Sequence, residues 1–169
     1  MTTTETTPLF TLSRTFRAPR ELVFRAWTQP EHLAQWMSSA GMTQFSTRLD
    51  LRPGGLFHYG LKTQDGQELW GKWIFREIEA PSRLVFVSSF SDAAGGLTRH
   101  PMAAQWPLET LSTVTFTEQE GKTLLTLTAT PIGASEPERQ AFAEALDGMD
   151  QGWGVTFAQL ETYLAGAQA

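Results

Sequence analysis

Residues 135–164, which read SEPERQAFAEALDGMDQGWGVTFAQLETYL, decide the fold of this chain. Ser135 followed three residues later by Glu138 is the pattern of a capping box, in which each residue satisfies a backbone N–H of the other. Large apolar residues then recur every three or four positions in one stripe, namely Phe142, Leu146, Met149, Trp153, Phe157, Leu160 and Leu164. The spacing predicts one long amphipathic helix that begins at the capping box.

A second stripe on the same helix consists of small residues, namely Ala141, Ala145, Gly148, Gly152 and Thr156. A glycine inside a helix costs about 1 kcal/mol relative to alanine, so Gly148, Gly152 and Gly154 together give up roughly 3 kcal/mol. Either another backbone approaches this side of the helix closely, or the helix leaves space there for a bound molecule. The sequence leaves both interpretations open.

Upstream of the helix, apolar and polar residues alternate from Phe45 to Pro131, with turn residues between the alternating runs. This period of two predicts an antiparallel meander, whose last hairpin has on its core face Val114, Phe116, Leu125 and Leu127. Asp65-Gly66 predicts a type I′ hairpin turn. The strand at 69–78 carries large apolar residues on both faces, so the sequence does not assign its inner face.

The first part of the chain predicts a strand at 9–17 followed by two short helices. Pro19 lies near the first position of the first helix, where proline is favoured. Thr28 followed by Glu31 predicts a capping box at the start of the second helix.

The order of these elements predicts an α+β helix-grip fold, in which a curved antiparallel sheet wraps around the long C-terminal helix. We expect one such domain at 9–165, after a disordered tail at 1–8. A sheet that curls around a helix leaves a wedge between the two, and such wedges hold ligands.

Composition excludes several classes of protein. The 169 residues carry a net charge of −5, whereas proteins that bind duplex nucleic acid normally have the opposite sign. Cysteine is absent, which excludes disulfide scaffolds, thiol nucleophiles and cysteine-ligated metals. No apolar run is long enough for a membrane span, and the N-terminus lacks the pattern of a secretory signal. We therefore expect a cytoplasmic protein without a nucleic-acid partner or membrane insertion.

The three histidines, His32, His58 and His100, fall in separate segments without metal-ligand spacing. We expect His32 on a helix surface and His58 in solvent, on the strand face opposite Phe57 and Tyr59. The chain also lacks nucleophile and nucleotide-binding motifs. We therefore expect no metal and no cofactor, and we assign no catalytic residue.

We expect the wedge to be a ligand cavity lined from the sheet and the long helix by Phe57, Tyr59, Trp73, Gly148, Met149, Gly152, Trp153 and Phe157. The loop at 91–109 is longer than most connections and contains the apolar residues Met102 and Trp106. We expect these two residues to cap the cavity as a lid, with Arg99 and His100 at its rim. In the alternative interpretation, Trp106 only pins the loop to the core.

Several segments match a known family in their order and spacing. They are APRELVFRAWTQPEHL at 18–33 followed by Trp36, DLRPGG at 50–55, PSRLVF at 81–86, TVTF at 113–116, TLLTL at 123–127, and Gly152-Trp153. Together they resemble the heat-shock-protein-90 ATPase activator homologue family, which belongs to the START-like superfamily (SRPBCC proteins, with the birch-pollen-allergen fold). The resemblance implies a helix-grip fold with a hydrophobic cavity and does not imply a reaction.

Three functions therefore stay open. The first is non-catalytic binding of a small hydrophobic or amphipathic molecule in the cavity, and we favour it. The second is a cyclase- or aromatase-like enzyme that uses the same cavity. The third is an interaction module that acts on a chaperone or another protein. The ligand, any reaction and the oligomeric state are not predicted.

Overall fold

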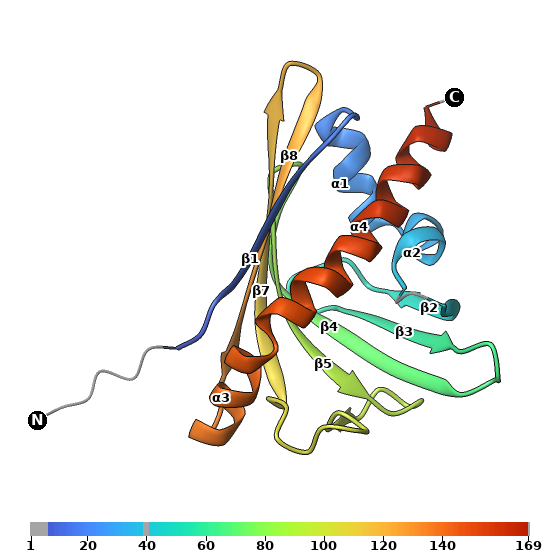
Figure 1. The fold of residues 1–169 in the computed structure, drawn as a ribbon. Coiled ribbons are helices and arrows are strands. Elements are labelled where there is room, and N and C mark those ends of the chain that lie inside the picture. Colours follow the sequence, from blue (N-terminus) through green and yellow to red (C-terminus); the bar gives the residue numbers. More distant parts are fainter. Residues whose placement is uncertain (1–6, 39–40, 169) are drawn as a thin grey trace, which may run out of the picture.

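A curved antiparallel sheet and a long C-terminal helix that crosses it form the frame of the protein (Figure 1). The computed structural model describes residues 7–38 and 41–168. Residues 1–6, which make up most of the expected tail, lie outside the described residues. The expected helix-grip arrangement is confirmed, with two short helices after the first strand.

The elements follow the predicted order along the chain. They are β1 (Phe10–Phe16), α1 (Arg20–Thr28), α2 (Pro30–Trp36), β2 (Thr43–Leu49), β3 (Leu56–Lys62), β4 (Glu68–Glu79), β5 (Arg83–Ser91), β6 (Leu97–Thr98), β7 (Glu109–Gln119), β8 (Lys122–Ile132), α3 (Glu136–Glu144) and α4 (Leu146–Ala167). The strands lie in the order β1-β8-β7-β5-β4-β3-β2, and the short β6 pairs with β5 off this path. All neighbouring strands are antiparallel, so the meander predicted from the period of two is confirmed.

The C-terminal segment forms two helices, so the prediction of one continuous helix from the capping box is wrong. The capping box itself is confirmed, because the N–H of Glu138 donates to Ser135 Oγ (3.3 Å) and the N–H of Ser135 donates to Glu138 Oε1 (2.9 Å). The chain bends at Ala145, whose N–H donates to the carbonyl of Phe142 in a tighter turn. The bend lets α3 pack on β8 while α4 crosses toward β1 and α2.

The start of α2 also differs from the prediction. Thr28 is still part of α1, and its hydroxyl donates to the carbonyl of Phe24 (2.8 Å). Because this hydroxyl is already used, Gln29 takes the cap position of α2 without a side-chain bond, and Pro30 follows at the first helical position. The predicted capping box of Thr28 and Glu31 is therefore wrong.

The type I′ turn lies in a different hairpin from the one predicted. Asp65-Gly66 belongs to a five-residue loop at 63–67, in which Gly66 has a φ of +89° and the N–H of Thr63 donates to the carbonyl of Gln67 (2.9 Å). By contrast, Glu120 and Gly121 have φ values of 52° and 81° and connect β7 directly to β8. Two positive φ values in a two-residue loop identify a type I′ turn there.

Two features of β4, a bulge and an apolar residue on its outer face, explain why the sequence did not assign its inner face. Its register with β5 shifts between Phe75 and Glu77, so the alternation of faces is interrupted by a bulge. Before the bulge, Gly71, Trp73 and Phe75 are buried on the inner face. On the outer face Trp70 stacks on His58 (5.1 Å between ring centroids) and gives that face an apolar residue of its own.

His58 is buried, so the expectation that it is solvated is wrong. Its side chain is 3% exposed, and Nε2 lies 3.1 Å from the carbonyl of Asp92 in the turn after β5. That turn and the Trp70 ring cover the outer face of the sheet at this point. His32 is partly buried on α2, where Nδ1 is hydrogen-bonded to the Tyr163 hydroxyl of α4.

The hydrophobic core fills the space where α1, α2 and the C-terminal half of α4 meet the sheet. Trp27 lies at its centre, fully buried, with the Trp36 ring 4.9 Å away and the Phe157 ring 6.3 Å away. The same indole stacks on Trp73 (5.9 Å) and Trp153 (6.3 Å). Trp73 and Trp153 also line an open space beside the core.

Candidate functional site

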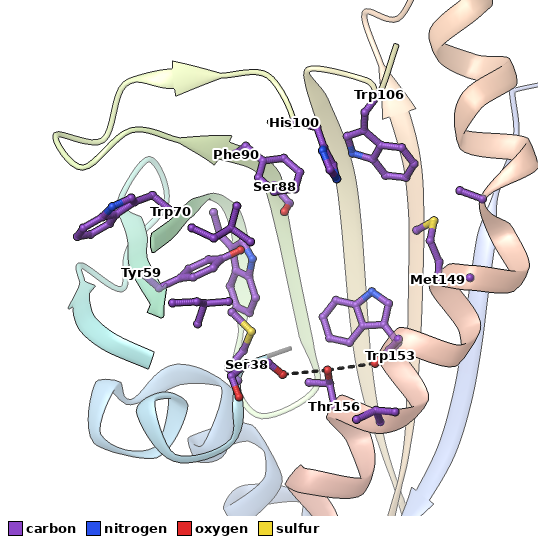
Figure 2. A pocket seen from close by; sticks show the side chains of 18 of the residues that line it. Ser38, Tyr59, Trp70, Ser88, Phe90, His100, Trp106, Met149, Trp153 and Thr156 are labelled. Carbon is purple, nitrogen blue, oxygen red and sulfur yellow. Dashed lines mark hydrogen bonds between the residues drawn. The ribbon is translucent and has the colours of Figure 1, made fainter. Parts of the chain in front are cut away.

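A cavity of about 680 Å³ lies between the inner face of the sheet and the N-terminal half of α4 (Figure 2). A smaller space of about 180 Å³ shares part of its wall, including Tyr59, Trp106, Met149 and Trp153. We call the larger space the α4 cavity. Its walls come from the sheet, from α4 with the end of α3, and from the loop between β6 and β7.

The sheet wall is built by Tyr59 of β3, Trp73 of β4, and Ser88 and Phe90 of β5. The register places Tyr59 opposite Gly71, and a side chain at Gly71 would collide with the Tyr59 ring and hydroxyl. The missing side chain therefore lets the Tyr59 ring lie flat across β4. This is a local reason for a glycine in the middle of a strand.

The helix wall contains Gly148, Met149, Gly152 and Trp153. A Cβ atom added at Gly148 or Gly152 would meet no atom within 4 Å among the described residues outside the helix backbone. Among the described residues, no neighbouring backbone approaches these two glycines. Both are exposed, so the space that they border is an open part of the cavity. Next to them, the Thr156 hydroxyl lies 3.2 Å from the carbonyl oxygens of both Ser38 and Gly152 and joins α4 to the segment after α2 (Figure 2).

The loop wall is made by His100 and Trp106, which lie together above the cavity in Figure 2. Trp106 packs on Phe142 of α3 (5.5 Å between ring centroids), and His100 packs on Phe90 of β5 (4.7 Å). Arg99, expected at the rim, forms an ion pair with Glu138 of α3 (2.8 Å). The loop is thus attached to α3 at two points.

Met102 is not in the cavity, contrary to the expectation that it caps it. Met102 is 89% exposed and is not among the residues that line the cavity. The N–H of Met102 donates to Nδ1 of His100 (3.0 Å), and this turn directs the methionine outward while it holds the histidine over the cavity.

Most of the residues expected at the site lie in the lining, namely Tyr59, Trp73, His100, Trp106, Gly148, Met149, Gly152 and Trp153. Phe57 and Phe157 are fully buried behind it, where Phe57 packs edge-on against Trp73 (4.8 Å) and Phe157 against Trp153 (5.6 Å). They support the wall without facing the space.

The lining also contains residues that sequence reasoning did not place at a site, namely Met37, Ser38, Leu61, Leu69, Trp70, Ser88, Phe90, Glu144, Ala145, Val155 and Thr156. Trp70 borders the space, although its ring stacks on His58 on the outer face and is directed away from the cavity in Figure 2. Ala145 and Thr156 belong to the small-residue stripe, so extending that stripe to both ends would have found them. Ser88 and Phe90 share one face of β5, and the alternation of that strand was their only signal.

The titratable groups at the cavity are few. Burial raises the pKa of the Tyr59 hydroxyl to about 12, so this group stays protonated at neutral pH. Burial also lowers the pKa of His100, which favours the neutral imidazole. Glu144 accepts a hydrogen bond from Gln140 Nε2 (3.1 Å) on the same helix. Across residues 7–38 and 41–168, no three histidine or carboxylate side chains come together as a metal site.

The family comparison covers almost the whole domain. The model of the family described as "Activator of Hsp90 ATPase homolog 1-like protein" matches residues 17–165. None of the curated protein sequences matches the chain. Among the described helices, none is long and apolar enough to cross a lipid bilayer.

Solved structures with the same fold come from several bacteria. A protein from Nitrosomonas europaea is 25% identical, with a TM-score of 0.74, and the match covers 95% of this chain and 96% of that one. A protein from Arthrobacter aurescens is 27% identical, with a TM-score of 0.74, over 94% of this chain and 86% of that one. A protein from Mycobacterium smegmatis, at 23% identity and a TM-score of 0.75 over 94% and 91% of the two chains, shares the fold. By the match to the family model, the chain belongs to the family of Activator of Hsp90 ATPase homolog 1-like proteins.

Proposed function

We propose that the protein binds a small hydrophobic or amphipathic molecule in the α4 cavity. The observation that carries this proposal is the open space beside Gly148 and Gly152, opposite an aromatic wall. Each helical glycine costs about 1 kcal/mol relative to alanine, and close packing does not offset that cost here. A bound molecule that occupies the space does offset it.

The size and chemistry of the space support the same proposal. A volume of about 680 Å³ lies within the range of small-molecule sites. The rings of Tyr59, Trp106 and Trp153 offer stacking surfaces on the sheet, loop and helix sides of the cavity. Binding without catalysis fits the titratable groups, because Tyr59 stays protonated and Glu144 is the single carboxylate in the described lining.

A titration with the neutral fluorescent probe N-phenylnaphthylamine tests the proposal. The probe gains fluorescence in apolar sites, so we expect a saturable increase that corresponds to one molecule per chain. An increase that is linear in probe concentration, without saturation, would contradict binding in a defined cavity.

A second candidate is catalysis in the same cavity, and His100 is the observation that favours it. Its imidazole lies at the cavity, and the lowered pKa leaves it neutral and able to accept a proton. Native mass spectrometry of the wild-type protein and of His100→Ala, both incubated with a molecule that co-purifies from the host, tests this function. Conversion by the wild type and not by the variant would support an enzyme.

The family description favours a third candidate, which is action on a chaperone ATPase. The test measures ATP hydrolysis by a purified heat-shock-protein-90 chaperone with and without the protein. A rise in the rate would support this role, and an unchanged rate would leave ligand binding as the function.

A further inference from the structure

Four of the polar side chains that line the α4 cavity have a hydrogen-bond donor without a partner among the described residues. The hydroxyls of Tyr59 and Ser88 and the indole N–H groups of Trp106 and Trp153 donate to no group in the described residues. All four side chains are labelled around the space in Figure 2. Two side-chain atoms of the described chain, Arg20 Nε and Trp27 Nε1, are both inaccessible to solvent and without a partner. The four cavity groups are not among them, so they are accessible to a guest.

His100 adds a fifth donor because its tautomer is fixed. The N–H of Met102 donates to Nδ1 of His100, so Nδ1 carries the lone pair. In the neutral ring the hydrogen then lies on Nε2. No hydrogen bond from Nε2 is present among the described residues, and the ring lines the cavity.

Charged groups at the cavity are unequally distributed. The described lining contains no lysine and no arginine, whereas Glu144 contributes a carboxylate. The whole chain has a net charge of −5. An anionic guest would therefore lose its hydration without gaining a cationic partner.

A cationic guest would suit Glu144 and the aromatic rings, but it would leave the donors unsatisfied. The N–H and O–H hydrogens carry positive partial charge, so they repel a cation and find no acceptor lone pair on it. A guest with acceptor oxygens satisfies these donors instead, and buried donors that stay unpaired weaken binding.

We propose that the α4 cavity selects a neutral aromatic molecule with a carbonyl or similar acceptor oxygen. The inference rests on the proposed function, since it names the ligand class of the same site. The aromatic part stacks between the sheet wall and Trp153, and the acceptor oxygen uses its two lone pairs to accept from one or two of the donors of Tyr59, Trp153 and the loop.

Four probes with the same two phenyl rings test the inference. They are benzophenone (neutral acceptor), diphenylmethane (no acceptor), diphenylacetate (anion) and benzhydrylamine, the primary amine of diphenylmethane (cation). Each competes with N-phenylnaphthylamine on the wild-type protein at neutral pH. Diphenylmethane is the more hydrophobic of the two neutral probes, so a cavity without hydrogen bonding would bind it more tightly than benzophenone.

We expect benzophenone to bind about tenfold more tightly than diphenylmethane, and the two charged probes to bind more weakly than benzophenone. Equal or tighter binding of diphenylmethane, or tighter binding of either charged probe, would overturn the inference and leave the proposed function intact. If neither N-phenylnaphthylamine nor any of the four probes binds, both the proposed function and the inference fail.

Two variants and their control locate the effect. Tyr59→Phe and Trp153→Phe each remove a donor, so we expect the preference for benzophenone over diphenylmethane to fall about threefold in each. Tyr163→Phe removes a hydroxyl that bonds His32 outside the cavity, and it should leave the preference unchanged. An unchanged preference in both cavity variants would overturn the inference.

Irradiation of bound benzophenone gives an independent readout, because the excited ketone attaches to C–H groups beside it. We expect the labelled peptide to contain Met149 of the cavity wall. Met102, which is 89% exposed and outside the cavity, serves as the internal control. Labelling at Met102 without Met149 would overturn the inference.

Discussion

The two halves of α4 carry the same apolar spacing but have different environments. In the C-terminal half, Phe157, Leu160 and Leu164 are at most 2% exposed and pack into the core. In the N-terminal half, Met149 and Trp153 are partly buried, and Gly148 and Gly152 beside them border the α4 cavity. Periodicity thus identifies the inward side of a helix, but it does not tell whether protein or open space lies opposite.

The largest expected effect comes from Phe157→Ala in the C-terminal half of α4, which packs into the core. This change removes a fully buried ring that packs on Phe16 and Trp27, so we expect a loss of about 3–5 kcal/mol in the free energy of unfolding. Trp153→Ala, one turn earlier, should cost clearly less, because one side of that ring faces the cavity. Urea unfolding of both variants measures the difference, and an equal loss would break the comparison between the two halves.

The next effect concerns Trp106 of the loop between β6 and β7, which lies across the α4 cavity from the N-terminal half of α4. The ring is partly buried, so Trp106→Ala should lower the free energy of unfolding by about 1–2 kcal/mol. We also expect faster release of N-phenylnaphthylamine in stopped-flow experiments, since the ring covers the cavity. A loss of 3–5 kcal/mol with unchanged release would instead identify Trp106 as a residue that only pins the loop.

A smaller effect with the opposite sign is expected at Gly152. Alanine is the better helix former, and its Cβ would meet no described atom within 4 Å, so Gly152→Ala should raise the free energy of unfolding by about 1 kcal/mol. Gly71→Ala is the matched contrast, because a methyl group there collides with Tyr59. If both variants lower the free energy of unfolding, the N-terminal half of α4 does not border open space at Gly152.

The smallest effect is the pH dependence contributed by Glu138, whose ion pair with Arg99 attaches the loop to α3. The bonds from Ser135 and Arg99 lower the pKa of Glu138 from 4.5 to about 2. A lowered folded-state pKa gives stability that is present above pH 4.5 and is lost as the pH falls toward 2.

Glu138→Gln should therefore cost about 0.5 kcal/mol at neutral pH and flatten the acid side of the stability profile. Thermal unfolding between neutral pH and pH 2 checks this expectation. A variant whose acid profile matches that of the wild type would show that the pair does not contribute.

The order of elements and the core face of the last hairpin could be predicted because they depend on local periodicity. The bend at Ala145 could not, since it depends on α3 packing on β8 while α4 crosses to β1. The inward side chains of β3 also depend on a neighbouring element, in this case on the residue opposite each of them in β4. Phe57 and Tyr59 share one strand face, but Phe57 lies opposite Trp73 and is buried, whereas Tyr59 lies opposite Gly71 and reaches the cavity.

The exposure of Met102 and the burial of His58 could not be predicted from the sequence. The exposure of each side chain depends on one hydrogen bond to a turn. For Met102 this is the bond of its N–H to His100, and for His58 it is the bond to the carbonyl of Asp92. A lone apolar residue in a loop and a lone histidine in a strand carry no periodic signal from which such contacts could be predicted.

Binding in the α4 cavity requires that the space beside Gly152 holds a small molecule. Gly152→Leu and Gly166→Leu form a matched pair. Both glycines lie on α4, neither has a neighbour among residues 7–38 and 41–168 within 4 Å of an added Cβ, and Gly166 is outside the cavity lining. Titration of both variants with N-phenylnaphthylamine, with urea unfolding as the control for folding, is the most direct test. We predict that Gly152→Leu stays folded and loses at least about tenfold in affinity, while Gly166→Leu binds like the wild type. A folded Gly152→Leu protein with wild-type affinity, or a loss of about 1–3 kcal/mol from overpacking in Gly152→Leu alone, would contradict the account.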